Sequence, residues 1–238
     1  MRENLNIKTE DGKKIYGVLD YQAKTRKLII FVHGFRDNKS VHLLFNAPSF
    51  FNAKGFTTYR FDLYSSKRAG RILDECNLDT HARDLNQVIK HFQDDYDEIF
   101  LIGISLGGPV ILRSNLEQIK KIVLWDGSVK RNPESEKGKL LWSEEFNCYV
   151  SRSGVRCLIG KEMVDDWENI DYDEWIKNCQ VPTKVISAGN GLLVSTWNKL
   201  ADTLPFVKEY TVIEGATHCF DEEGAEQKVH SETFEFLK

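Results

Sequence analysis

Residues 98–111 read EIFLIGISLGGPVI, and this stretch decides the fold. An apolar run typical of a buried strand is interrupted at GISLG and resumes as the start of a helix. The five residues fit the pattern G-x-S-x-G, in which a sharp turn between a strand and a helix lifts a serine hydroxyl out of the sheet. We therefore expect Ser105 to be a nucleophile, and Gly103 and Gly107 to let two backbones approach closely. The alternative is that Ser105 lies in a glycine-rich turn that only connects two elements.

The segments around this turn alternate between strand and helix patterns. Short apolar runs predict strands, and apolar residues at helical spacing predict helices between them. The predicted strands span residues 7–10, 14–21, 27–32, 56–62, 98–102, 119–125, 184–187 and 207–213, and the predicted helices include 41–54, 82–92, 195–201 and 222–237. Asp11-Gly12 predicts an antiparallel hairpin of the first two strands, and Asp79 or Thr80 is the expected N-cap of the second helix. The alternation indicates an α/β fold with a mostly parallel sheet and helices on both faces.

This alternation fails after the sixth predicted strand, between residues 128 and 179. The segment is charged and combines the hairpin-like stretch FNCYVSRSGVRCLIG with short helical patterns. It holds three of the five tryptophans, Trp142, Trp167 and Trp175. A long excursion of this kind is either a cap over a site or a floppy insertion, and its aromatic content favours the cap. We therefore predict a core made of residues 1–127 and 180–238, with residues 128–179 inserted as a cap.

Charge and composition narrow the classes of function. The chain has 32 basic and 36 acidic side chains, a mixed balance with a net charge of −4, so neither nucleic acid nor an anionic membrane is an expected partner. The longest uncharged stretch, residues 99–112, is too short to span a bilayer, and residues 1–14 lack the apolar core of a secretory signal. The five cysteines are an odd number without zinc-type spacing, which indicates free thiols and a cytoplasmic protein.

Cofactor motifs are absent from the sequence. There is no G-x-x-x-x-G-K loop, no dinucleotide fingerprint and no cluster of residues at metal-ligand spacing. We therefore expect neither a metal nor an organic cofactor.

Three features together resemble the α/β-hydrolase fold family over essentially the whole chain. They are the GISLG turn, the His33-Gly34 pair after an early strand, and His218 directly after the last predicted strand. The inserted segment, with its hairpin and the stretch GKEMVDDWENID, resembles that of small bacterial cinnamoyl and feruloyl esterases. The resemblance implies a serine hydrolase that acts on an ester or thioester through an acyl-serine intermediate.

The resemblance also implies roles for individual residues. Ser105 would be the nucleophile and His218 the general base, in the chain order that such hydrolases use. The backbone N–H groups of Phe35 and Leu106 would form the oxyanion hole. His33 is expected to brace the oxyanion loop rather than to react.

The acid of the expected triad is missing from its usual place. In the resembled family an Asp lies in a segment of the form G-x-A-D-x-x-V, whereas the matching stretch here, SAGNGLLV, puts Gly191 at that position. Three alternatives follow. Asp126, after the preceding strand, could serve as the acid; Asn190 could orient His218 as a neutral partner; or Ser105 and His218 could work as a weakened pair.

The expected partner is a small-molecule acyl ester or thioester. A thioesterase, an acyltransferase or a small peptidase would use the same turn, because the turn sets the mechanism and the cap sets the substrate. Gly191 also motivates a different class, a ligand-binding protein that has kept the fold and lost efficient catalysis. Lys67, Arg68 and Arg71 lie in a loop expected at the same sheet edge, where they are either solvated or available to a substrate carboxylate.

Overall fold

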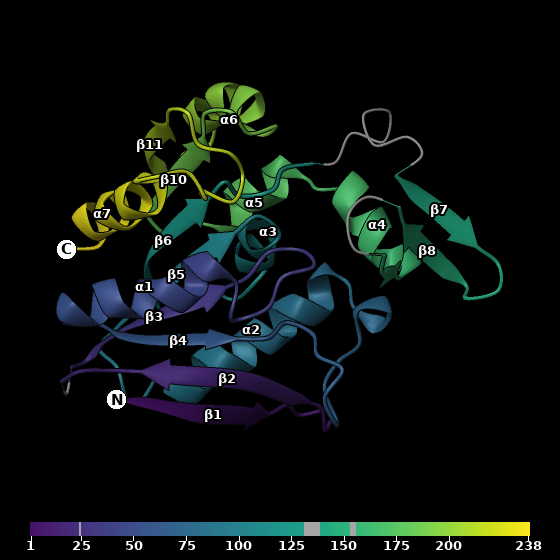
Figure 1. The fold of residues 1–238 in the computed structure, drawn as a ribbon, viewed down its shortest axis with the longest axis horizontal. Helices are drawn as coiled ribbons and strands as arrows, with labels where there is room; N and C mark the ends of the chain where they lie inside the picture. The colour runs from purple at the N-terminus through teal and green to yellow at the C-terminus, as the bar shows by residue number, and fades with distance from the viewer. Residues whose placement is uncertain (24, 131–138, 153–155) are drawn as a thin grey trace.

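The computed structural model describes residues 1–23, 25–130, 139–152 and 156–238. Its main element is an eight-stranded sheet with the strand order β1-β2-β4-β3-β5-β6-β10-β11 (Figure 1). The strands are β1 (Arg2–Lys8), β2 (Lys14–Asp20), β3 (Lys27–Val32), β4 (Thr57–Phe61), β5 (Glu98–Ile104), β6 (Ile119–Trp125), β10 (Thr183–Ala188) and β11 (Val207–Ile213). The order and the connections are those of an α/β-hydrolase fold.

The sheet is parallel except at its N-terminal edge. β1 pairs with β2 through the predicted hairpin, with Ile7 opposite Ile15, and β2 runs antiparallel to β4. The pairs from β4 to β11 are all parallel. The predicted fold class is therefore confirmed, with an antiparallel start and a mostly parallel continuation.

Strand β3 shows why the sheet needs helices on both faces. Ile29 and Phe31 point into one apolar cluster, whereas Leu28, Ile30 and Val32 point into the other, and all five are fully buried. Because successive side chains of a strand alternate between its faces, such a continuous apolar run requires cover on both sides.

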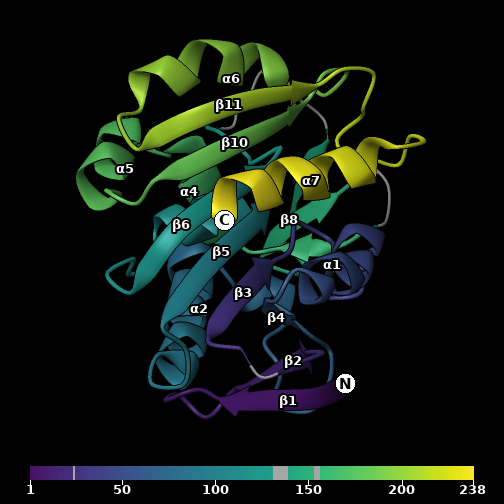
Figure 2. The ribbon, with the colours of Figure 1, turned by 90° about the vertical axis from the view of Figure 1, so that its left-hand side faces the viewer.

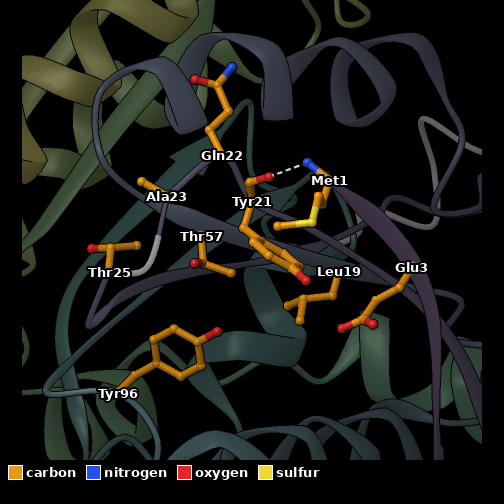
Figure 3. Close-up of a pocket in the computed structure, with 9 residues that line it drawn as sticks. All are labelled: Met1, Glu3, Leu19, Tyr21, Gln22, Ala23, Thr25, Thr57 and Tyr96. Carbon is orange, nitrogen blue, oxygen red and sulfur yellow. Dashed lines mark hydrogen bonds between the residues drawn. The ribbon is translucent and has the colours of Figure 1, made fainter.

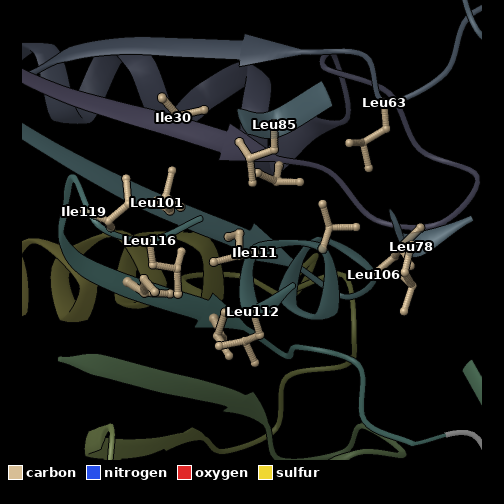
Figure 4. Packing of buried hydrophobic residues seen from close by; sticks show 14 of the residues in the cluster. Ile30, Leu63, Leu78, Leu85, Leu101, Leu106, Ile111, Leu112, Leu116 and Ile119 are labelled. Atoms are coloured by element: carbon tan, nitrogen blue, oxygen red, sulfur yellow. The ribbon is translucent and has the colours of Figure 1, made fainter. Parts of the chain in front are cut away.

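Helices supply this cover on both sides of the central strands (Figure 2). The helices are α1 (His42–Ala53), α2 (Leu78–Phe92), α3 (Gly107–Leu112), α4 (Lys161–Glu168), α5 (Tyr172–Asn178), α6 (Val194–Leu200) and α7 (Ala225–Leu237), with short 3-10 turns η1 (Leu73–Glu75) and η3 (Ala201–Thr203). α1 and α7 pack on one face, and α2 and α3 pack on the other. Figure 4 shows the second cluster, where Leu85 of α2 and Ile111 of α3 meet Ile30 and Leu101 of the sheet.

The start of α2 differs from the prediction. Asn77, not Asp79 or Thr80, is the N-cap: its side-chain oxygen accepts a hydrogen bond from the Thr80 N–H at 2.8 Å. Asn77 has the extended backbone that a cap requires, with φ −140°, so its side chain can reach the third helical residue. Asp79 lies in the first turn and pairs with Arg113 at 2.5 Å.

The chain between β6 and β10 forms a separate small sheet and two helices. β7 (Leu140–Ser143) pairs with β8 (Cys148–Ser151), and β8 pairs with β9 (Leu158–Ile159), all antiparallel. The predicted hairpin-like stretch is thus found in β8 and β9, although its residues 153–155 lie outside the described residues. The first hairpin, in which Trp142 lies opposite Tyr149, was not predicted.

The described residues contain no helix that is both long and apolar enough to cross a bilayer. All five cysteines are free, as expected from their odd number and spacing.

Two glycines of the GISLG turn are required by the close packing of α3 against β5 and β3. A Cβ on Gly103 would lie 2.7 Å from the carbonyl carbon and oxygen of Gly107, and a Cβ on Gly107 would lie 2.3 Å from the Val32 oxygen. Backbone atoms cannot move aside as a flexible side chain can, so any larger residue would force the strand and the helix apart.

We therefore predict that Gly103→Ala destabilises the fold by roughly 1–3 kcal/mol, because the added methyl group overpacks a backbone contact. Gly108→Ala is the matched control, since its methyl group would meet the Gly127 Cα at 3.3 Å, which requires only a small shift, and would favour the helix. Urea unfolding measures both. Equal stability of the two variants would contradict the steric account of the turn.

Candidate active site

Ser105 lies at the corner between β5 and α3 with a strained backbone. Its φ is 50°, a left-handed value that is uncommon for a residue with a side chain. Its N–H donates to the Trp125 carbonyl at 3.2 Å, and its carbonyl accepts from the N–H groups of Gly108 and Ser128, each at 2.9 Å. These three bonds hold the corner, and Ser105 is half-buried. Backbone strain held in this way by its surroundings is typical of functional positions.

The Ser105 hydroxyl has a partner that the sequence analysis missed. Its Oγ lies 3.2 Å from the Oγ of Ser128, and either hydroxyl can donate. Within the described residues no hydrogen bond joins Ser105 to His218. The sequence feature that could have identified Ser128 is its place two residues after Asp126, in the turn that follows β6, the strand next to β5.

His218 and Asp126 are joined directly. The distance from His218 Nδ1 to Asp126 Oδ2 is 2.5 Å. The Asp126 side chain is fully buried, whereas 43% of the His218 side chain is exposed, so the ring has one face toward solvent. Asp126 Oδ1 also accepts from the Ala188 N–H at 3.2 Å, and Asp126 has a left-handed backbone with φ 42°. Of the alternatives for a partner of His218, the structure pairs it with Asp126.

Gly191 lies beside this carboxylate. A Cβ at Gly191 would be 3.1 Å from Asp126 Oδ2, so the backbone position expected to bear the acid adjoins the oxygen that contacts His218. The neighbouring Asn190 side chain is used elsewhere, because its Nδ2 donates to the Gly215 carbonyl at 3.0 Å.

The loop after β3 lies against the nucleophilic turn. A Cβ on Gly34 would be 3.1 Å from the Ser105 Cβ, so the backbone at this point is in contact with the serine. Within the described residues, the N–H groups of Phe35 and Leu106 make no hydrogen bond. Two unsatisfied N–H donors beside Ser105 fit what an oxyanion hole requires.

His33 ties the loop after β3 to the backbone at Leu63. Its Nε2 accepts from the Leu63 N–H at 2.9 Å, and its Nδ1 donates to the Gly34 carbonyl at 2.7 Å. These contacts fix a neutral ring protonated at Nδ1. Complete burial lowers the pKa of His33 to about 4, so the ring stays neutral at physiological pH. A bracing role for His33 agrees with these contacts.

Asp37 is a second residue that the sequence analysis did not single out. Its Oδ2 lies 2.9 Å from the position of a Cβ on Gly34, the same point that is 3.1 Å from the Ser105 Cβ. Burial raises the pKa of Asp37, and the nearby charges of His218, His42 and Arg36 act in the opposite direction. Its position in the loop after His33-Gly34 was the signal that could have found it.

The inserted segment contacts this loop. The rings of Phe35 and Trp167 pack edge to face with centroids 4.9 Å apart, and Arg36 Nη1 donates to Ser151 Oγ at 3.4 Å. The Asp166 carboxylate accepts from the Leu78 N–H at 2.9 Å, which joins α4 to the start of α2. The insertion is therefore docked next to the loop that follows β3.

The basic loop considered for a substrate carboxylate is engaged elsewhere. Arg71 forms a two-point ion pair with Asp84, at 2.5 and 2.8 Å, and contacts Asp11 at 2.9 Å. The Lys67 amine lies 5.0 Å from the centre of the Tyr16 ring, near the hairpin.

A surface hollow of about 350 Å³ lies away from these residues (Figure 3). Its lining includes Thr25, Thr57 and Tyr96, which precede or begin β3, β4 and β5, whereas Ser105 and Asp126 follow their strands. The hollow thus lies at the opposite end of the parallel strands from Ser105. Within the described ranges there is also no group of three or more His, Cys, Asp or Glu side chains placed to hold a metal ion.

A parallel sheet with a strained serine at the end of β5, and a histidine–aspartate pair at neighbouring strand ends, defines the class of α/β-hydrolase folds. The chain belongs to the alpha/beta hydrolase family, whose model matches residues 29–156, more than half of the sequence. A comparison with curated proteins gives no significant match.

Solved structures share the fold along their whole length. Est1E from Butyrivibrio proteoclasticus, in a structure with ferulic acid bound, has a TM-score of 0.82 at 19% identity, with 98% of this chain and 97% of that chain covered. An esterase from Pyrococcus furiosus has a TM-score of 0.73 at 20% identity, with 100% and 91% covered. The esterase domain of a Rhodothermus marinus protein has a TM-score of 0.74 at 15% identity, with 98% and 96% covered. At these identities the likeness concerns the fold.

Buried histidines couple the stability of this fold to pH. Burial lowers the pKa of His33 and His230 to about 4 and that of His81 to about 3, from an ordinary value of 6.5. The unfolded chain therefore takes up these protons near pH 6.5, whereas the folded chain takes them up only near pH 3–4. The stability is fully present above pH 6.5 and is lost as the pH falls from there toward 4.

We predict that the free energy of unfolding falls by roughly 1–2 kcal/mol per buried histidine between pH 7.5 and 5. His81→Phe should remove one such contribution, since both ring nitrogens of His81 are buried without a partner among the described residues. His91→Phe, on the exposed side of the same helix, is the control. Urea denaturation at the two pH values measures the difference, and an unchanged pH dependence in His81→Phe would refute this account.

Proposed function

We propose that this protein is a serine hydrolase that cleaves a small carboxylic ester or thioester through an acyl-serine intermediate. The observation that carries the proposal is the 2.5 Å hydrogen bond between His218 and Asp126, on the same sheet edge as the strained Ser105. A cytoplasmic location is part of the same proposal, because the five cysteines are free and thiols persist in a reducing compartment.

Each residue has a defined step in this mechanism. Ser105 Oγ attacks the carbonyl carbon of the substrate while its proton passes to His218 Nε2. The N–H groups of Phe35 and Leu106 donate to the oxygen that becomes negative in the tetrahedral intermediate. The intermediate collapses, and the alcohol or thiol leaves with the proton from His218. Water then attacks the acyl-serine by the same route and releases the carboxylic acid.

Attack requires the Ser105 hydroxyl to turn from Ser128 toward His218. In substrate-free enzymes catalytic hydrogen bonds are often long and form only when substrate is bound, so this rotation is compatible with the proposal. Ser128 can then donate to the Ser105 oxygen while Ser105 donates to the imidazole, which keeps both hydroxyls paired.

Asp126 is proposed as the acid. Its carboxylate accepts the Nδ1 proton of His218, which leaves Nε2 free as the base and stabilises the imidazolium formed during attack. The bond favours catalysis over a ligand-binding protein, since that alternative was motivated by Gly191 at the usual position of the acid. Residues 128–179 are proposed to act as a cap, on the basis of their contacts with the loop of Phe35.

A thioesterase, an acyltransferase or a small peptidase would use the same residues. The choice of a carboxylic ester draws on the esterases among the structurally similar proteins, and on Est1E, which has been solved with ferulic acid bound. Activity on a panel of p-nitrophenyl esters, acyl thioesters and amides would rank these possibilities.

We predict that a fluorophosphonate probe labels Ser105 and that Ser105→Ala abolishes both labelling and p-nitrophenyl ester turnover. Removing the nucleophile of such a site typically costs about 10⁶-fold in kcat. Ser128→Ala is the matched control, because it keeps the nucleophile and should still be labelled. Retention of labelling and turnover in Ser105→Ala would refute the proposal.

We predict that Asp126→Asn lowers kcat by as much as about 10⁴-fold while KM changes little, because the imidazole loses the carboxylate that sets its tautomer. Asn190→Ala should retain most of the wild-type kcat, since the Asn190 side chain bonds Gly215. Steady-state kinetics of both variants with one ester decides whether Asp126 or Asn190 supports His218. A large loss in Asn190→Ala with a small one in Asp126→Asn would assign the role to Asn190 instead.

A further inference from the structure

Asp37 is a half-buried carboxylate without a cation of its own. Among the described residues its oxygens form no ion pair or hydrogen bond. The neighbouring bases have other partners: Lys39 pairs with Asp62, His42 lies 2.9 Å from Asp221, and Arg36 contacts Ser151. The Asp37 carboxylate is thus partly desolvated and has no directly bonded partner among the described residues, so a positive group that came close to it would be stabilised.

The position of Asp37 brings this charge to the reacting centre. The position that a Cβ on Gly34 would take lies 2.9 Å from Asp37 Oδ2 and 3.1 Å from the Ser105 Cβ. His218 is near enough for its charge to oppose the rise in the pKa of Asp37. A substrate bound for attack by Ser105 would therefore lie near the Asp37 carboxylate.

This location also selects against negative substrates. Of the basic residues in the loop after β4, Arg71 is bonded to Asp84 and Asp11, and the Lys67 amine lies over the Tyr16 ring. A carboxylate on the substrate would meet the negative charge of Asp37, and like charges in a partly desolvated site repel strongly.

We propose that Asp37 is a specificity-determining residue that selects esters bearing an ammonium group close to the ester carbonyl. This inference rests on the proposed ester hydrolysis at Ser105. The ammonium group replaces the missing cation of Asp37, and the attraction operates in binding and in the transition state alike. Asp37 forms no bond to the reacting atoms and takes no part in proton transfer.

The test uses two pairs of esters that match in shape and differ in charge. The first pair is the p-nitrophenyl esters of 4-(trimethylammonio)butanoate and 5,5-dimethylhexanoate; the second is the butanoate esters of choline and of 3,3-dimethylbutanol. In each pair a trimethylammonium group replaces a tert-butyl group. We expect the wild-type kcat/KM to favour the cation by about tenfold in at least one pair, and the preference to shrink as ionic strength rises.

Asp37→Asn should abolish that preference while turnover of the neutral ester stays within about threefold of wild type. Asp221→Asn is the matched control: it removes a carboxylate that already contacts His42, and it should keep the preference. No preference in wild type, or an equal loss for both esters in Asp37→Asn, would overturn the inference. Turnover of the neutral ester that survives Ser105→Ala would instead defeat the proposed hydrolase function, so the two failures are distinguishable.

Discussion

The close approach of β5 and α3 is the constraint on which the site depends. A Cβ on Gly103 would collide with the Gly107 backbone of α3, and a Cβ on Gly107 would collide with the Val32 oxygen of β3. Between these two glycines the chain turns at Ser105, which has φ 50° and lies at the end of the strand. The strain is balanced by the hydrogen bonds that tie the Ser105 backbone to Trp125, Gly108 and Ser128.

Two neighbouring strands hold both fixed parts of the site. β5 and β6 are parallel, and Ile104 lies opposite Trp125 in their register, so Ser105 and Asp126 each follow the last paired residue of a strand. Residues 126–128 therefore contact both the histidine and the serine of the site: Asp126 contacts His218, and Ser128 contacts the Ser105 hydroxyl. The separation of these groups is set by the strand spacing of a sheet, which side-chain motion does not change.

Much of this arrangement could be predicted from the sequence, for physical reasons that differ between its parts. Strand β3 is predicted by its continuous apolar run, and the turn at Ser105 is predicted by two glycines spaced as in a sharp strand-to-helix turn. The N-cap of α2 was misplaced by two or three residues because Asn77, Asp79 and Thr80 all cap well, and only the backbone conformation selects among them.

The partner of His218 could not be selected from the sequence. Asp126 and Asn190 are separated along the chain, and which one meets the imidazole depends on the path of the loop after β11. Ser128 and Asp37 were missed for the same reason, since Ser128 meets Ser105 from a neighbouring strand end and Asp37 comes near it only through the fold of the loop after β3. Short-range patterns carry no information on such contacts.

The position of the His218–Asp126 hydrogen bond explains why residue 191 is a glycine. In the sheet order β6 lies beside β10, and β11 lies beyond it, so His218, in the loop after β11, must reach past the end of β10 to meet Asp126. Gly191 follows β10 at this crossing, and a Cβ there would lie 3.1 Å from the Asp126 oxygen that contacts the ring. A residue with a longer side chain would occupy the space in which the bond forms. Gly191 and Asp126 therefore depend on each other. A carboxylate that follows β6 can reach His218 only if no side chain fills the space at the end of β10.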